Sequence, residues 1–139
     1  MKDFISSVGE LEQATKSRLE LSAALVEALP DAMVVINESG TIVLINLQAE
    51  LLFGYHRTEM VGQSVDLLLP EANRAVHLQH RTGFMNSPRV RQMGTSGLHL
   101  RGRRKTGAEV SVEIMLSPVV TREGMFVIAV VRRRNEEMI

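Results

Sequence analysis

The chain has 139 residues, of which 45% are hydrophobic and 23% charged, and its 16 basic side chains balance its 16 acidic ones. This length and balance predict one soluble globular domain with a single core. Because Cys is absent, a disulfide framework, a thiolate nucleophile, a Cys-ligated zinc site and an iron–sulfur cluster are excluded. The longest strongly apolar stretch, 125–131, is far shorter than a membrane span, and no signal peptide is visible, so we expect a cytoplasmic location.

The neutral sum conceals a segregated charge distribution. Residues 1–71 carry 11 acidic and 4 basic side chains, whereas residues 72–108 carry 8 basic and no acidic ones. Residues 109–139 carry 5 acidic and 4 basic side chains. The basic interval predicts a locally positive surface that either faces an anion or is simply solvated.

Residues 1–28 form the first expected element, an amphipathic helix that ends before Pro30. Apolar residues recur along it at helical spacing, although too irregularly to indicate a coiled coil. Such a helix usually packs on its own domain or on a second copy. We expect a dimerisation or signalling helix, with an interface formed by Phe4, Val8, Leu11, Leu21 and Leu25.

From residue 29 the pattern changes to short strands and helical turns. Strands are expected at 32–36 and 41–45, joined by a turn that contains Gly40. Asn46 is suited to cap a short helix over 47–53 that Gly54 ends. Further helical segments are expected at 58–60, 65–69 and 71–85, the last being one clear amphipathic helix.

The C-terminal part predicts three more strands. The first covers 90–101, the second alternates from Val110 and ends at Pro118, and the third, 125–131, is nearly continuously apolar and therefore central in the sheet. The order of elements predicts an α+β fold with a five-stranded antiparallel sheet. Residues 29–132 are expected to form this domain, and residues 133–139 to begin a C-terminal linker.

Several segments, in this order, resemble a PAS domain over about residues 25–132. The resemblance rests on LPDAMVVI (29–36), IVLIN (42–46), LFGY (52–55), EMVGQ (59–63), LPE (69–71) and GRRKTG (102–107). In the last of these, Thr106 replaces the Asp that is usual in the family. The resemblance implies a PAS fold whose sheet cups a pocket closed by short helices and a longer F helix, here 71–85.

The resemblance also implies a sensory module rather than an enzyme. PAS domains regulate effectors such as histidine kinases, cyclases or phosphatases, and no effector motif is present in these residues. We therefore expect an effector elsewhere in the same protein or in a partner. A ligand-free module for dimerisation or protein interaction is the alternative.

The segment from Pro70 to His77 is similar to the F helix of haem-binding PAS oxygen sensors. The resemblance implies haem b as a cofactor and places the iron ligand at His77, with His80 as a second candidate. It further implies that Ile114 and Leu116 contact haem from the strand. Nearby arginines, namely Arg74, Arg81 and Arg91, are the implied partners of the haem propionates. The haem sensors carry a strand Arg that reaches the bound gas, and residues 89–96 offer no match for it. The alternative role of His77 is therefore structural: a hydrogen bond to a loop or strand that holds the F helix in place.

Other ligands are less well supported by the composition. A flavin adduct needs a Cys, and a non-covalent flavin would lack a flanking Trp. A small carboxylate held by Arg and His, or a core filled by the eight Met residues, are further alternatives. Nucleic acid is disfavoured as a partner despite the basic turn at 101–105, because the net charge is zero and aromatic residues make up only 4%.

Overall fold

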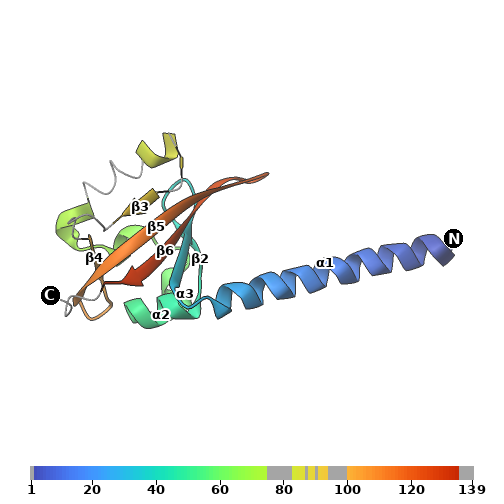
Figure 1. Cartoon of the computed structure of the whole chain (residues 1–139), viewed down its shortest axis with the longest axis horizontal. Coiled ribbons are helices and arrows are strands. Elements are labelled where there is room, and N and C mark those ends of the chain that lie inside the picture. The colour runs from blue at the N-terminus through green and yellow to red at the C-terminus, as the bar shows by residue number, and fades with distance from the viewer. Residues whose placement is uncertain (1, 75–82, 87, 90, 94–99, 135–139) are drawn as a thin grey trace.

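The structure is a computed structural model that describes residues 2–74, 83–86, 88–89, 91–93 and 100–134. Its centre is an antiparallel sheet, from which one long helix projects (Figure 1). The strands, in chain order, are β1 (Ala32–Ile36), β2 (Ile42–Ile45), β3 (Arg91–Met93), β4 (Leu100–Arg103), β5 (Glu109–Thr121) and β6 (Gly124–Arg133).

The sheet has the expected five positions, in the order β2-β1-β6-β5-β3, and β4 also pairs with β5. The expected strand at 90–101 is present as two pieces. Between Met93 and Leu100 the chain advances seven residues, while its partner strand advances only from Ile114 to Val112. The pieces β3 and β4 therefore pair with the same edge of β5 but not in one continuous register.

Strand β6 lies between β1 and β5, as its continuous apolar sequence predicted. The expected end of β5 at Pro118 is wrong, because the strand continues to Thr121 and Pro118 lies opposite Val127. Proline has no backbone N–H, so it cannot donate a hydrogen bond to a neighbouring strand. Beyond Leu116, where the described pairing with β3 ends, β5 is paired only with β6 among the described residues, and this accommodates the proline.

Short helices cover the sheet: α2 (Leu47–Phe53), α3 (Arg57–Met60), η1 (Val65–Leu68) and η2 (Glu71–Asn73). The expected caps of α2 are confirmed, since Asn46 accepts a hydrogen bond from the N–H of Ala49 and Gly54 adopts φ 80°. The turns expected near 58–60 and 65–69 are confirmed as α3 and η1. Of the helix expected at 71–85, the described parts are η2, Arg74 and residues 83–86, and all are helical.

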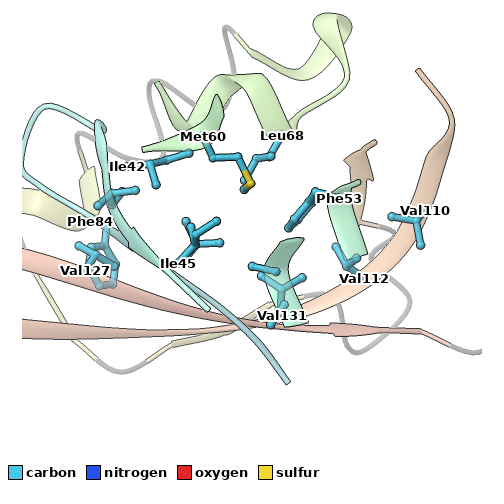
Figure 2. Close-up of a cluster of buried hydrophobic side chains, with 14 residues drawn as sticks. Ile42, Ile45, Phe53, Met60, Leu68, Phe84, Val110, Val112, Val127 and Val131 are labelled. Atoms are coloured by element: carbon cyan, nitrogen blue, oxygen red, sulfur yellow. The ribbon is translucent and has the colours of Figure 1, made fainter. Parts of the chain in front are cut away.

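The core lies between these helices and the sheet. Figure 2 shows Phe53 and Leu68 from the helical layer facing Val112 and Val131 from the strands. These side chains are each no more than 5% exposed. Burial of this apolar surface is the main force that holds the helices on the sheet.

The first helix, α1 (Lys2–Ala28), extends away from the sheet (Figure 1). Residues 6–25 are all exposed, so this part of the helix does not pack on its own domain, which was one of the two expected arrangements. Leu11, at 68% exposed, is an extreme case. Among the described residues, no helix is both long and apolar enough to cross a membrane.

Candidate ligand-binding cavity

A cavity of about 280 Å³ lies between the sheet and the helical layer. On the sheet side it is lined by Val34 of β1, Ala129 of β6, and Ile114 and Leu116 of β5. Phe53 closes it from α2. Among the described lining residues, only Arg101 and Asn73 are of a charged or amide type, so the cavity is suited to an apolar ligand.

The register of the strands explains why there is a cavity here. Val34 lies opposite Ala129, and Ala129 lies opposite Leu116, so the three side chains form one row on the face toward the helices. Ala129 is much smaller than either neighbour. The row is therefore shallow at its middle, and the space above it is left unfilled.

A glycine gives the cavity its second constraint. Gly102 of β4 is buried, and a Cβ added there would lie 3.0 Å from Cε1 of Phe53. Only glycine lets the Phe53 ring approach the strand this closely without displacement. The absence of a side chain at Gly102 thus allows α2 to lie this close to β4.

Of the described residues that the resemblance implies as haem contacts, only some line the cavity. Ile114 and Leu116 both line the cavity. Arg74 is turned to the neighbouring turn, where its Nε donates to the Asp66 carbonyl at 3.0 Å. Arg91 lies opposite Leu116 in the sheet register. His77, His80 and Arg81 lie outside the described residues.

Other lining residues were not identified from the sequence as site residues. Phe53 lies in the segment LFGY, which carried the family resemblance but no role. Arg101, at the rim, lies in the basic interval, and its Nε is 4.0 Å from the Glu109 carboxylate. The alternation of the strands was the signal that could have assigned Val34 and Ala129 to the lining, because residues of one parity share a face.

Apart from the cavity, a polar cluster joins α1 to the domain. We call this cluster, which consists of Glu27, Asn46, Glu50 and Arg57, the junction. Asn46 is fully buried and uses both ends of its side chain. Its Oδ1 accepts from the backbone N–H groups of Met33 (2.9 Å) and Ala49 (3.0 Å). Its Nδ2 donates to the carbonyls of Val26 at the end of α1 (3.2 Å) and Asp31 (3.0 Å).

Arg57 completes the junction by bridging two carboxylates. Its guanidinium donates to Glu27 at 3.1 Å and to Glu50 at 2.7 Å. These hydrogen bonds lower the pKa of Glu50 and, from Glu27 first and Glu50 second, raise the pKa of Arg57. Each carboxylate also accepts a backbone N–H, Glu27 from Leu47 at 3.1 Å and Glu50 from Arg57 at 3.0 Å. Each acid therefore binds the start of a helix as well as the arginine.

The charge segregation of the sequence is partly cancelled in the fold. Lys105, in the basic interval, forms an ion pair with Glu59 of α3, and its hydrogen bond lowers the pKa of Glu59. The backbone N–H of Lys105 also donates to the Phe53 carbonyl at 2.8 Å. At this point the basic interval faces acidic residues of the same chain rather than an external anion.

The chain is thus a mixed sheet-and-helix domain with an apolar cavity between its two layers. The family model described as PAS fold matches residues 20–134, and the chain belongs to this family. The solved PAS domain of the HTR-like protein from Haloarcula marismortui is similar to it, with a TM-score of 0.77 and 21% identity. That similarity covers 91% of this chain and 99% of the other.

Curated relatives are sensor proteins. The chain is 29% identical over 107 residues to Sensor protein FixL of Bradyrhizobium diazoefficiens, and 30% identical over 105 residues to Oxygen sensor protein DosP of Escherichia coli. These matches cover 77% and 76% of this chain, but only 21% and 13% of the relatives. The chain thus spans about a fifth of their length or less, and is a PAS sensor domain related to sensor kinases and oxygen sensors.

Proposed function

We propose that this PAS domain is a cytoplasmic sensor module that binds a small apolar ligand or cofactor in its cavity and regulates an effector. The cavity itself is the observation that carries the proposal. Its lining is almost wholly apolar, and several lining residues, among them Val34, Phe53 and Val112, belong to the hydrophobic core. A void of this size costs stability unless something occupies it.

Haem b is the cofactor that we propose. The apolar lining, with Ile114 and Leu116 in its wall, suits the apolar faces of a macrocycle. The iron ligand that the resemblance implies is His77, which lies outside the described residues, with His80 as the second candidate. When bound, haem would supply an iron centre for gas or redox sensing. The similarity to a protein named as an oxygen sensor supports this choice.

The size of the cavity has a consequence for this proposal. Ligand pockets usually measure about 300–1,000 Å³, and this cavity, at about 280 Å³, lies just below that range. A macrocycle therefore requires the helical wall to move outward. In our proposal the sensor responds to occupancy through this movement.

The effector that we propose is a histidine kinase, cyclase or phosphatase, linked to the domain or acting as its partner. Support comes from relatives that are named as sensors, together with a signal transduction histidine-protein kinase, AtoS of Escherichia coli, at 32% identity over 68 residues. In this proposal the chain performs no catalysis of its own.

A haemin titration followed by absorption tests the cofactor proposal. The wild-type chain should show a saturable Soret band at one haemin per chain. His77→Ala should shift or abolish the band, and Ala129→Leu should abolish saturable binding because the added side chain fills the cavity. His56→Ala, which alters an exposed His at the start of α3, is the matched control and should bind as wild type. No saturable band, or equal binding by Ala129→Leu, would overturn the proposal.

A second candidate function, dimerisation, is favoured by the exposed face of α1. Val8, Leu11, Leu21 and Leu25 are between 38% and 68% exposed, and Phe4 lies on the same helix. We propose that a second copy covers them. Sedimentation should show a dimer that Leu11→Glu combined with Leu25→Glu converts to a monomer, whereas Gln13→Glu leaves it intact. A wild-type monomer at high concentration would contradict this.

A further inference from the structure

We propose that α2 transmits the state of the cavity to α1, because its two ends are built into the cavity wall and the junction. The proposal rests on the proposed function in that the cavity is taken as the ligand site. It adds which residues convert occupancy into a change in the direction of the projecting helix.

The C-terminal end of α2 belongs to the cavity. Phe53 is its last residue, is 3% exposed, and lines the cavity. The Phe53 ring is held against Gly102, and the Phe53 carbonyl accepts from the N–H of Lys105 at 2.8 Å. A ligand that needs more room than the cavity offers must push this ring, and with it the end of the helix.

The N-terminal end of α2 belongs to the junction. Asn46 caps the helix and, through Nδ2, also holds the Val26 and Asp31 carbonyls that flank the exit from α1. Glu27 of α1 accepts the N–H of Leu47, the first residue of α2. The last turn of α1 and the first turn of α2 are thus joined by direct hydrogen bonds on both sides.

Arg57 links α1 and α2 directly, because its guanidinium pairs with a carboxylate on each helix. It donates to Glu50, in the middle of α2, and to Glu27, near the end of α1. An isolated ion pair at a surface contributes little. Here, however, both carboxylates also hold backbone N–H groups, so a displacement of α2 disturbs several directional hydrogen bonds together.

The short length of α2 makes it a rigid connection. Seven residues form about two turns, at about 1.5 Å per residue, and Ala49 in the middle is fully buried. Phe53 therefore cannot move outward without moving Glu50 and the Asn46 cap. The junction has two arrangements in this proposal: the closed one seen here, and an opened one that an occupied cavity favours.

The projecting helix amplifies a small change at the junction. From Ala28 to Gln13, α1 extends about 22 Å, so a tilt of about 5° moves Gln13 by about 2 Å. Because the chain has no Cys, cysteines introduced at Gln13 and at the exposed Thr106 can be spin-labelled specifically. The distance distribution between the two labels then reports the direction of α1 in the full chain.

The experiment compares this distribution in variants of the two ends of α2, without ligand. Arg57→Gln should broaden it, while Arg122→Gln, at the exposed β5–β6 turn, should not. Gly102→Ala and Phe53→Trp crowd the cavity contact and should shift the mean by about 2 Å, while Gly83→Ala, with open space beside it, should leave it unchanged. Circular dichroism verifies that each variant is folded.

Coupling is overturned if both crowding variants, folded, give the wild-type distribution, even where Arg57→Gln broadens it. It is equally overturned if Arg57→Gln has no effect. Neither arm uses haemin, so a chain that fails to bind haemin refutes the proposed cofactor without affecting this test.

Discussion

The two ends of α2 differ in almost every physical respect. At Phe53 the helix borders an apolar cavity, where contacts are non-directional and space is unfilled. At Asn46 and Glu50 it is held by hydrogen bonds that leave the buried Asn46 amide fully used. The comparison teaches that a change in volume acts on one end of the helix, whereas the other end turns the resulting displacement into broken, directional bonds.

Removing the Asn46 side chain should have the largest effect on stability. Asn46→Ala leaves two backbone carbonyls and two backbone N–H groups without this partner in a buried site. We expect a loss of about 3 kcal/mol in the free energy of unfolding. Urea denaturation measures it, with Asn73→Ala at the cavity rim as the matched change. If Asn46→Ala and Asn73→Ala lost the same unfolding free energy, the junction would stabilise the fold no more than the cavity rim does.

Filling the cavity should act in the opposite direction. Ala129→Leu places apolar volume into the shallow middle of the sheet row. We expect the ligand-free chain to gain about 1 kcal/mol in unfolding free energy, read from the same urea transitions. Ala24→Leu, on the exposed part of α1, is the control and should change little. A destabilised Ala129→Leu chain would mean that the space is already filled.

The junction should lose strength in acid. The Arg57 hydrogen bonds lower the folded pKa of Glu50 from its ordinary value of 4.5. The stability that Glu50 contributes is therefore complete above pH 4.5 and falls as the pH decreases through the folded pKa. Glu50→Gln should be about 1 kcal/mol less stable at pH 7, and the difference should shrink below pH 4.5. A difference that stays constant down to pH 3 would contradict this assignment.

The smallest effect should come from the ion pair between Lys105 and Glu59. Both side chains are more than a third exposed, so solvent and salt screen their attraction. We expect Glu59→Gln to change the unfolding free energy far less than Asn46→Ala does. An effect as large as that of Asn46→Ala in the same urea measurement would remove the distinction between a buried junction and a surface pair.

Local signals in the sequence predicted the elements whose form depends on neighbouring residues. Asn46 and Gly54 marked the two ends of α2, and both function as caps. The continuous apolar run of β6 placed it at the centre of the sheet. Pro118 was misread as a strand end, because pairing with β6 is a long-range contact that the local proline signal does not contain.

The site could be predicted only in part, for a related reason. Alternation assigned Ile114 and Leu116 to one face, and the family resemblance gave that face a role. The cavity, however, depends on Ala129 lying between Val34 and Leu116 across three strands. The junction depends on Arg57 reaching Glu27, thirty residues earlier. No local pattern reports such distances, because both arise from how the strands and helices pack.

The most direct test of the account is the affinity for haemin of the wild-type chain and of Arg57→Gln, measured in one titration series. If occupancy and the closed junction oppose each other, weakening the junction must favour binding, since coupling between two sites is reciprocal. We predict that Arg57→Gln binds haemin about five-fold more tightly, with Arg122→Gln equal to wild type. Equal or weaker binding by Arg57→Gln would contradict the account.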